Sequence, residues 1–328
     1  MTKELAIIFS DAHVHLYKQF NQDDRRLTNG IALIDYIFRL AHNNGINLIL
    51  FPGDLYDQMN VVSTKAGVAI LSCFDRNFRA YPEIHFVAIS GNHDQATKNL
   101  LNSPAESALM HLTMFPQFHL LDADRYYETA GGNLICGIPY FEFSEHFKTV
   151  LEETTNGIAQ EGLTFLMMHQ VVASGLPIED CIEPDHILFD KFSMIFNGHL
   201  HKAEEVTEKF INIGSPMHRD AGDIGIAKGI WLVDLCDPYS TLTFKDITNK
   251  FPQFIHKPEG AELTEWESQQ YVIRVPESLP MSEADVKVVE NFTSDLSPAV
   301  IITNYCAAVI SKEAERKAKL EYGLSLLQ

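Results

Sequence analysis

Aspartate, asparagine and histidine residues recur in five short segments of this sequence, and each segment follows a predicted strand. The segments are Asp11-Ala12-His13, Gly53-Asp54-Leu55-Tyr56-Asp57, Gly91-Asn92-His93-Asp94, the lone His169, and Gly198-His199-Leu200-His201. Carboxylate, amide and imidazole groups form a mixed oxygen and nitrogen ligand set that suits manganese, iron or zinc. Because the carboxyl ends of strands lie along one edge of a sheet, these segments can converge on a single crevice.

Asp54 is the natural carboxylate to bridge two metal ions, because each of its oxygens can bind one ion. The other candidate metal ligands divide into two sets: Asp11, His13 and His201 for one ion, and Asn92, His169 and His199 for the other. The D-x-H and H-x-H spacings place both side chains of a pair on one face of an extended segment. We expect the glycine before Asp54, Asn92 and His199 to let the backbone turn sharply.

Such a pair of ions would support the hydrolysis of a phosphate ester. Two cations roughly 3.5–4 Å apart clamp the attacking and leaving oxygens and lower the pKa of a bridging water, so that hydroxide is the nucleophile. His93 is the candidate proton donor to the leaving alkoxide, and Asp94 is expected to orient it. We expect Asp57 to hold the turn or a ligand histidine, without touching metal.

Each motif has an ordinary explanation when it is taken alone. A strand-end histidine such as His169 is often merely hydrogen-bonded, and G-N-H-D occurs in unrelated proteins. The hypothesis of a dinuclear site therefore depends on five motifs occurring in order. His15 either faces substrate or is an exposed structural histidine, and for His218 and Arg219 a position near the cleft, with Arg219 contacting phosphate, is a further alternative.

The composition restricts the class of protein. The 328 residues are 46% hydrophobic, and their five scattered cysteines suggest neither a disulfide framework nor a thiolate zinc site. No apolar run is long enough for a membrane span and no signal-peptide pattern is present, which predicts a cytoplasmic protein without membrane contact. A net charge of −19 argues against a protein that grips nucleic acid over its whole surface. A DNA substrate would then need a partner subunit for most of its binding.

Apolar runs that alternate with helical patterns predict an α/β fold. Strands are expected at 5–9, 47–51, 84–89, 134–138, 164–168, 193–196, 210–213 and 229–234, with a helix around 31–41. These elements form a predicted domain at 1–249, and a linker rich in turn residues follows at about 248–260. A small α/β cap is expected at 261–328, with strands at 271–275 and 299–304 and helices at 282–292 and 311–327.

The motifs between Asp11 and His201 resemble those of the calcineurin-like metallophosphoesterase superfamily. The resemblance implies a four-layer arrangement of mixed sheets, that is, a two-sheet β-sandwich flanked by helices. It also implies two divalent metal ions, usually manganese, with magnesium, iron or zinc as further possibilities. The metal ligands and the proton donor would be the matching residues given above.

Within this superfamily the chain is most similar to SbcD-type DNA exonuclease subunits, and in length to the compact forms that bacteriophages encode. The features behind this are Asp94 after Gly91-Asn92-His93, Gly214-Ser215-Pro216 after the last histidine motif, and the small cap. The Arg-Gly of protein Ser/Thr phosphatases is missing after Asp57. The resemblance implies action on double-stranded DNA ends, with a coiled-coil SbcC-like ATPase and a homodimer within the complex.

The leading hypothesis is therefore a manganese-dependent exonuclease, with single-strand endonuclease activity as an option, that serves recombination, repair or replication. Little follows the cap except the predicted helix at 311–327. Either that helix docks the ATPase, or the contact with the partner lies elsewhere. One alternative is a phosphodiesterase or phosphomonoesterase for nucleotides or similar metabolites. Another is a non-catalytic module with a degenerate site, which the presence of all seven proposed ligands and His93 disfavours.

Overall fold

The computed structural model describes residues 3–16, 24–57, 62–96, 106–158, 162–172 and 181–275. The chain divides into two compact units. The first unit comprises the described residues up to Arg219 together with Ile226–Gln253, and it carries all five motifs. The second contains Asp220–Gly225 and the described residues from Phe254 onward. No helix of the described residues is long and apolar enough to cross a membrane.

Two six-stranded mixed sheets form the centre of the first unit. The first sheet has the order β12-β11-β1-β2-β3-β4, with β12 (Thr243–Asp246), β11 (Gly229–Asp234), β1 (Leu5–Ile8), β2 (Leu48–Phe51), β3 (His85–Ala88) and β4 (Phe118–Leu120). The strands from β1 to β4 are parallel, whereas β11 runs antiparallel to both β1 and β12. Ile7 pairs with Ile49 and Ile49 with Phe86, so apolar residues align across the sheet.

The second sheet has the order β5-β6-β7-β8-β10-β9. Its strands are β5 (Tyr126–Glu128), β6 (Leu134–Ile138), β7 (Thr164–Met168), β8 (Met194–Asn197), β10 (Phe210–Asn212) and β9 (Glu204–Glu205). The four strands from β6 to β10 are parallel, and the short edge strands β5 and β9 run antiparallel. The parallel strands are buried along their whole length, as expected for a sheet that is covered on both faces.

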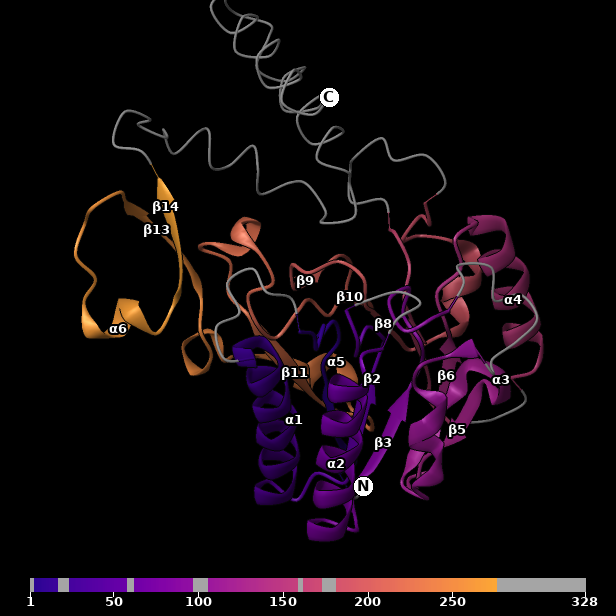
Figure 1. The fold of residues 1–328 in the computed structure, drawn as a ribbon. Coiled ribbons are helices and arrows are strands. Elements are labelled where there is room, and N and C mark those ends of the chain that lie inside the picture. Colours follow the sequence, from indigo (N-terminus) through magenta and orange to yellow (C-terminus); the bar gives the residue numbers. More distant parts are fainter. Residues whose placement is uncertain are drawn as a thin grey trace, which may run out of the picture. The chain divides into compact units, whose positions relative to one another are not determined.

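Helices and 3₁₀ turns connect the strands, and the three longest helices cover the outer faces of the two sheets. The helices are α1 (Arg25–Asn43), α2 (Thr64–Ala80), α3 (Leu121–Asp124), α4 (Ser144–Asn156) and α5 (Pro238–Thr241), with 3₁₀ turns η3 (Met110–Met114), η4 (Ile187–Lys191) and η6 (Thr248–Lys250). In α1, Leu33, Ile34, Ile37, Phe38 and Ala41 recur at helical spacing and are buried. Ser63 caps α2, because its side chain accepts a hydrogen bond from the amide of Ala66. Figure 1 shows α1 and α2 beside one another on the first sheet.

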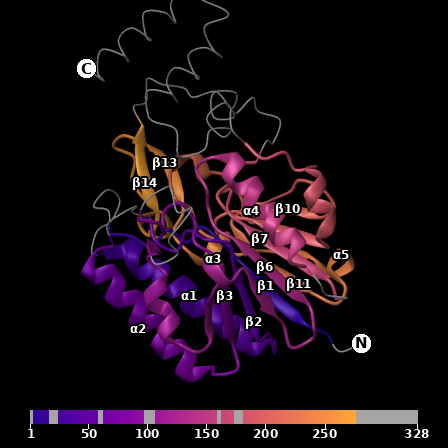
Figure 2. The same cartoon turned by 90° about the vertical axis from the view of Figure 1, so that its right-hand side faces the viewer.

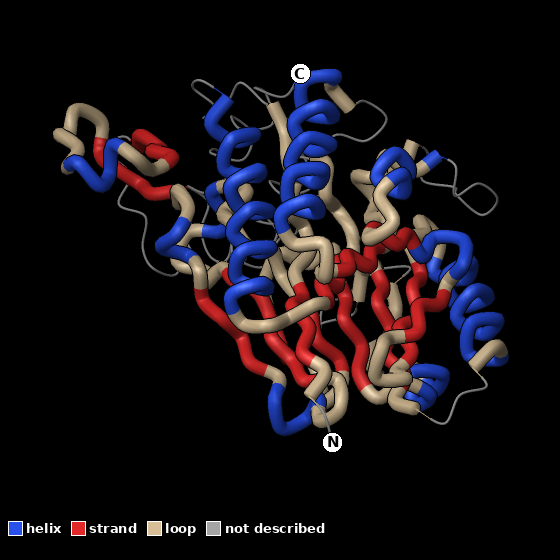
Figure 3. The backbone as a smooth tube through the Cα atoms, turned by 90° about the horizontal axis from the view of Figure 1, so that it is seen from below, coloured by secondary structure: helices blue, strands red, loops and turns tan. Residues whose placement is uncertain are grey.

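The alternation of side chains along the strands produces the layers. In β1, Ile7 packs toward the core beneath α1 and α2, whereas Ala6 and Ile8 pack into the core between the two sheets. A third core lies on the far side of the second sheet, where Phe147 and Leu151 of α4 meet that sheet. The order of layers is therefore helix, sheet, sheet, helix (Figure 2). In Figure 3 the strands of the two sheets lie together, and the longer helices of the first unit flank them.

The structure confirms the α/β class with mixed sheets, and all eight strands predicted in the first domain are present within one or two residues. The predicted linker was wrong in one respect. Its residues Phe254–Pro258 form β13, which pairs in parallel with β14 (Tyr271–Val275) in the second unit. That unit also contains η5 (Ala221–Asp223) and α6 (Glu265–Ser268). The cap elements predicted at 282–292, 299–304 and 311–327 lie outside the described residues.

Candidate metal centre

The segments that follow β1 and β2 run side by side and hold their polar residues together. The amide of Asp11 donates to the carbonyl of Gly53 at 3.0 Å, and the amide of His13 donates to the carbonyl of Asp54 at 3.1 Å. Val14 and Tyr56 extend this pairing with an isolated parallel bridge. The first two motifs thus continue the pairing of β1 with β2 beyond the end of the sheet.

Four of the proposed ligands adopt the left-handed backbone conformation. Their φ angles are +54° at Asp11, +43° at His13, +62° at Asp54 and +76° at His199. Each such residue costs of order 1–3 kcal/mol, and such costs persist only where the surroundings determine the conformation. Because strain of this kind clusters at functional sites, the backbone itself marks this edge of the sheets.

The glycines before the ligands act mainly through close packing. Gly53 has a φ of +92°, so the predicted sharp turn is present there. Gly91 and Gly198 do not have a positive φ, but each also begins a turn, because the amide of Asp94 donates to the carbonyl of Gly91 at 3.2 Å and the amide of Leu200 donates to that of Gly198 at 3.0 Å. A Cβ atom on Gly198 would lie 2.5 Å from Nδ1 of His169, and one on Gly91 would overlap the carboxylate of Asp54. These glycines therefore allow the motif segments to lie against one another.

The first half-site consists of Asp11, His13 and His201. Nε2 of His13 lies 3.1 Å from Nε2 of His201, and each of these nitrogens lies 3.7 Å from Oδ1 of Asp11. Oδ2 of Asp54 lies 3.6 Å from Nε2 of His13. The side chains of His13 and His201 are 3% and 13% exposed, so this half-site is buried but reachable through His201.

The second half-site consists of Asn92, His169 and His199. Oδ1 of Asn92 lies 3.1 Å from Nε2 of His169 and 3.1 Å from Nδ1 of His199. Oδ2 of Asp54 lies 3.3 Å from Nε2 of His169. The same carboxylate oxygen of Asp54 therefore faces both half-sites, and the structure brings all seven predicted ligands together.

Neighbouring acceptors fix which nitrogen of each imidazole faces the cluster. Nδ1 of His169 lies 2.6 Å from the carbonyl of Pro52, which can only accept, so Nδ1 carries a hydrogen and Nε2 is the nitrogen that faces Asp54 and would ligate a cation. Nδ1 of His13 faces Oδ1 of Asp57 at 3.3 Å. This is the arrangement expected of a carboxylate that orients a metal-binding histidine, the role the sequence suggested for Asp57.

Burial lowers the pKa values of His13 and His169, whereas the nearby carboxylates raise them. Burial lowers the pKa of His13, as does Arg219, but the carboxylates of Asp11, Asp57 and Asp54 outweigh both and raise it to about 9. Burial likewise opposes charge on His169, and Asp54 raises its pKa to about 9.

The pKa values of His201 and Asp54 shift in the opposite direction. Burial and the cations Arg219, His13 and Lys228 hold the pKa of His201 well below its usual range. Burial opposes ionisation of Asp54, but His169 and His13 hold its pKa well below the usual value. In the absence of metal, protonated imidazoles thus balance the buried carboxylates, and a cation would replace those protons.

Asp94 does not take the position predicted for it. Its Oδ2 accepts the amides of Asp54 at 2.7 Å and Gly91 at 3.1 Å, and its Oδ1 accepts the amide of Tyr56 at 3.0 Å. Burial, together with the charge of Asp54, raises the pKa of Asp94 to about 7. Asp94 therefore supports the turn that presents Asp54, and the predicted orientation of His93 by Asp94 is wrong.

His93 is oriented by a different group. Its Nδ1 lies 2.5 Å from the carbonyl of Asp57, and its amide donates to Oδ1 of Asp54 at 2.9 Å. Because a carbonyl only accepts, Nδ1 of His93 carries a hydrogen and Nε2 is the nitrogen that can exchange a proton. The His93 ring meets the His13 ring edge-on, with centroids 4.9 Å apart. His93 thus lies beside the first half-site, as expected of a proton donor.

The donor atoms fit divalent cations. Oδ1 of Asp11 is buried and has no hydrogen-bond partner among the described residues, although a carboxylate oxygen in such surroundings normally has one. Among the described residues, carboxylate and imidazole side chains form three groups in which the ligand atoms all lie within 4.8 Å of one another. Two of these groups consist of predicted ligands: Asp11-His13-His201 and Asp11-Asp54-His169. A cation would satisfy these facing oxygen and nitrogen lone pairs together.

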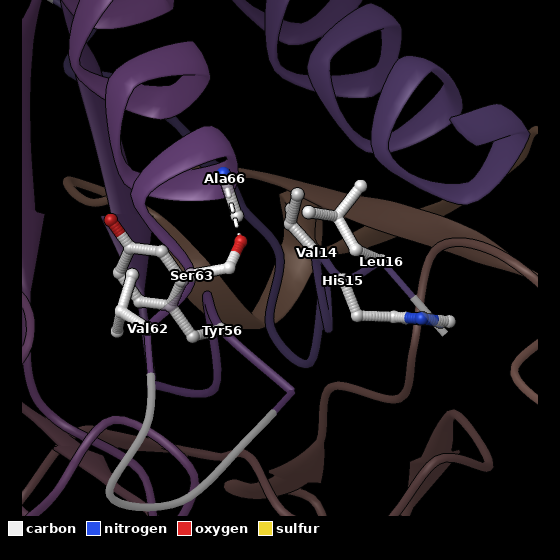
Figure 4. A pocket seen from close by; sticks show the side chains of 7 residues that line it. All are labelled: Val14, His15, Leu16, Tyr56, Val62, Ser63 and Ala66. Carbon is white, nitrogen blue, oxygen red and sulfur yellow. Dashed lines mark hydrogen bonds between the residues drawn. The ribbon is translucent and has the colours of Figure 1, made fainter. Parts of the chain in front are cut away.

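His15 lies outside the cluster, and its prediction as an exposed structural histidine was wrong. It is 7% exposed, and burial lowers its pKa to about 4. It lines a small hollow whose other walls are largely apolar, and Figure 4 shows the side chains that form it: Val14, His15, Leu16, Tyr56, Val62, Ser63 and Ala66. The alternative in which His15 faces substrate stays a prediction.

Some residues at the site were missed or underweighted by the sequence reasoning. The ring of Tyr140 stacks on His199 with centroids 5.8 Å apart and an interplanar angle of 23°. Tyr140 could have been predicted from its position just after the strand β6, because the motifs also follow strands at that edge of the sheets. Lys228 is fully buried, and its Nζ donates to the carbonyl of His201 at 2.9 Å and to Oγ of Ser215 at 2.8 Å. A single lysine before a strand gives no such signal in sequence.

Comparison with known proteins agrees with this geometry. The model of the calcineurin-like phosphoesterase family matches residues 6–203, and the chain belongs to this family. Membership implies metal-dependent hydrolysis of phosphate esters by two divalent ions, for which the cluster supplies candidate ligands. No curated protein sequence matches the chain.

Two solved structures are among those similar to this chain. The protein TT1561 of Thermus thermophilus is 13% identical, with a TM-score of 0.47, and the match covers 75% of this chain and 99% of that one. A dimetal phosphatase from Danio rerio is 9% identical, with a TM-score of 0.43, and the match covers 71% of this chain and 93% of that one.

Proposed function

We propose that this chain is a two-metal DNA exonuclease of the SbcD type, with manganese as its activating ion. The observation that carries the catalytic part is the position of Asp54, whose Oδ2 lies 3.6 Å from Nε2 of His13 and 3.3 Å from Nε2 of His169. One carboxylate that faces two sets of ligands is the arrangement a dinuclear centre needs. Asp11, His13 and His201 would hold one ion, Asn92, His169 and His199 the other, and Asp54 both.

When bound, the two ions supply a hydroxide nucleophile at neutral pH and stabilise charge on the phosphate oxygens. The residues of the chain provide the geometry for this reaction. The carbonyl of Pro52 and the carboxylate of Asp57 hold His169 and His13 with Nε2 toward the cluster. Asp94 fixes the turn of Asp54 through three backbone amides. The ligands are therefore preorganised.

His93 would protonate the leaving oxygen from Nε2. Its Nδ1 hydrogen is held by the carbonyl of Asp57 at 2.5 Å, which fixes the ring while Nε2 gains and loses a proton. An alkoxide such as a deoxyribose 3′ or 5′ oxygen is a poor leaving group without a proton. A positioned acid therefore favours a phosphodiester of this kind as substrate over an ester with an acidic alcohol.

The assignment to DNA ends is supported by the order of motifs, including Asp94 after Gly91-Asn92-His93 and Gly214-Ser215-Pro216 after the last histidines. With a net charge of −19, the chain would take most of its grip on DNA from a partner. We propose a coiled-coil SbcC-like ATPase as that partner, a homodimer within the complex, and action in the cytoplasm, that of the host if a phage encodes the chain.

The test is degradation of linear and nicked DNA by the purified protein with manganese, magnesium or zinc, with and without the co-purified ATPase. We expect His93→Ala to reduce degradation about a hundredfold to ten-thousandfold while two ions stay bound. The matched control is His42→Ala, because His42 pairs with Glu83 on the surface and its side chain is 50% exposed. Metal-loaded wild type that leaves every form of DNA intact, even with the ATPase, would overturn the proposal.

The strongly acidic composition favours one alternative, a phosphodiesterase or phosphomonoesterase for nucleotides or similar metabolites. A small substrate needs only the local field of the two ions, not an extended basic surface. Turnover of bis(p-nitrophenyl) phosphate or of free nucleotides, with DNA polymers left intact in every condition above, would favour this alternative.

A further inference from the structure

Arg219 directs its guanidinium at a nitrogen that belongs to the first half-site. Its Nη1 lies 3.2 Å from Nε2 of His201, and its Nε lies 3.4 Å from Oδ1 of Asp57. Nε2 of His201 is the atom that lies 3.7 Å from Asp11 and 3.1 Å from Nε2 of His13. An arginine thus contacts the same nitrogen that the proposed function assigns to a cation.

These two uses of His201 exclude one another. An imidazole nitrogen has a single lone pair, so Nε2 of His201 cannot accept a hydrogen bond from Arg219 while it ligates a cation. The contact of Arg219 with Asp57 does not depend on that lone pair. Loading of the half-site would therefore break the contact of Nη1 with His201 and leave that of Nε with Asp57, so that Nη1 could donate to a substrate oxygen instead.

The backbone beside Arg219 is anchored independently of the cluster. Arg26, in the first turn of α1, donates from Nη1 to the carbonyl of His218 at 2.8 Å and from Nη2 to the carbonyl of Arg219. The Arg219 side chain is 17% exposed, whereas Lys228, the other cation beside His201, is fully buried and donates to the His201 carbonyl. Of these two cations, Arg219 is the one that solvent and substrate can reach.

The charges of the site give the guanidinium an anionic partner. Asp11, Asp54 and Asp57 contribute three negative charges, which two divalent ions alone exceed. Arg219 and Lys228 then add two positive charges at the same place. This excess favours an anion beside Arg219, and a guanidinium binds phosphate oxygens in a planar, bidentate manner.

We propose that Arg219 binds the phosphate of the substrate, and that loading of the first half-site frees it to do so by occupying Nε2 of His201. This inference rests on the proposed two-metal chemistry and adds a substrate-binding residue to it. It makes metal occupancy a condition for the Arg219 contact, so that phosphate binding through Arg219 and metal binding are coupled.

The experiment compares wild type, Arg219→Gln, Arg219→Lys and the control Arg79→Gln in binding manganese and inorganic phosphate. Arg79 is a suitable control because its side chain is 78% exposed in an ion pair with Asp75, so its loss removes one charge far from the centre. Calorimetry gives the manganese stoichiometry and affinity first. The affinity for inorganic phosphate is then measured with and without manganese.

We expect Arg219→Gln to bind two manganese ions at least as tightly as wild type, because a neighbouring positive charge is removed. Its manganese-loaded form should bind phosphate about tenfold to a hundredfold more weakly than wild type, and Arg219→Lys should be intermediate. Without manganese, wild type and Arg219→Gln should bind inorganic phosphate with equal affinity. Arg79→Gln should match wild type throughout.

The proposal would be overturned if manganese-loaded wild type and manganese-loaded Arg219→Gln bound phosphate with equal affinity. It would also be overturned if Arg219→Gln weakened phosphate binding by the same factor with and without manganese. Loss of manganese from Arg219→Gln would also overturn it, because the residue would then support the metal ligands and not the substrate. Failure of the proposed function gives a different result, namely wild type that takes up fewer than two manganese ions.

Discussion

The two half-sites hold their histidines with different kinds of neighbour. In the first, Nδ1 of His13 meets the carboxylate of Asp57 at 3.3 Å, and this carboxylate also contacts Arg219. In the second, Nδ1 of His169 meets the backbone carbonyl of Pro52 at 2.6 Å, and His199 stacks on Tyr140. Both half-sites face the carboxylate of Asp54, but the other groups named here are ionised side chains at the first half-site and neutral groups at the second.

Two buried carboxyls, Asp57 and Asp122, differ in a similar way. Burial opposes ionisation of Asp57, but its hydrogen bond with His13, with help from Arg219, keeps its pKa well below the usual value. Asp122 accepts hydrogen bonds from the amide and the hydroxyl of Ser90, which precedes the ligand Asn92 by two residues. Burial outweighs these two hydrogen bonds and raises the pKa of Asp122 to about 6. A substitution at Asp57 should therefore act through charge, and a substitution at Asp122 through packing.

The largest effect should come from Asp54→Asn, which removes the group that both half-sites share. Asparagine keeps an oxygen for the amide of His93, which now donates to Oδ1 at 2.9 Å, but it loses the negative charge. We expect the loss of bound metal from both half-sites and a fall in kcat of at least about a thousandfold. Metal content and turnover of a phosphodiester measure this. If one ion stays bound at full affinity, Asp54 serves one half-site only.

Asp57→Asn should separate the half-sites. It removes the carboxylate behind His13 and leaves the Pro52 carbonyl behind His169 in place, so manganese affinity should fall about tenfold to a hundredfold in the first half-site alone. A calorimetric titration that resolves two binding events provides the measurement, with Asp122→Asn as the matched control. Equal weakening of both events would mean that the half-sites do not differ in this way.

The parts of this centre that sequence predicts are those encoded by local pattern. Short apolar runs with polar residues at their ends indicated the strands, and the ligand types at those ends indicated the seven residues that the structure brings together. The four-layer arrangement came from family resemblance, because periodicity alone does not show whether strands form one sheet or two. The short strand β13 was missed because its flanking Pro and Gly residues resemble a linker.

The role of Asp94 could not be read from sequence for a physical reason. Which donors its carboxylate meets depends on the approach of two turns that are about forty residues apart, with the amide of Asp54 at 2.7 Å. The neighbouring His93 suggested a side-chain pair, but backbone amides occupy the same oxygens. Lys228 and Arg219 likewise reach His201 only through the fold, because no spacing rule links them to the Gly198-His199-Leu200-His201 motif.

Metal binding should release protons, to a degree that falls as the pH rises. The raised pKa values of about 9 for His13 and His169 mean that both are protonated near neutral pH in metal-free protein. Because each must give up its Nε2 proton to ligate a cation, manganese affinity should rise with pH until about pH 9 and level off above it. His201, whose pKa is held well below its usual range, should contribute no proton.

Calorimetry in buffers of different ionisation enthalpy gives the number of protons released at each pH. From the imidazoles we expect nearly two protons at pH 7 for wild type and about one for His13→Ala, in which only His169 still gives up a proton; a proton released by metal-bound water would add to these numbers. A number that stays the same from pH 6 to pH 10 would show that the imidazoles are already neutral before metal binds.

The smallest effect on the metal centre should come from Asp122→Asn, which changes stability only. A carboxyl whose pKa is raised by folding is protonated more readily in the folded state, so its contribution to the free energy of unfolding falls as pH rises through the interval between the unfolded and folded values. For Asp122 this fall is about 2 kcal/mol between pH 4 and 7, given a folded pKa of about 6.

Asparagine mimics the neutral carboxyl, with Oδ1 accepting from the Ser90 amide and Nδ2 facing the Ser90 hydroxyl. Urea unfolding of metal-free Asp122→Asn should therefore lack the decline with pH that wild type shows. Asp57→Asn should show the opposite change, because folding lowers the pKa of Asp57, and its stabilising contribution is lost as pH falls. If both substitutions change the pH profile in the same direction, ionised and neutral surroundings do not distinguish the two half-sites.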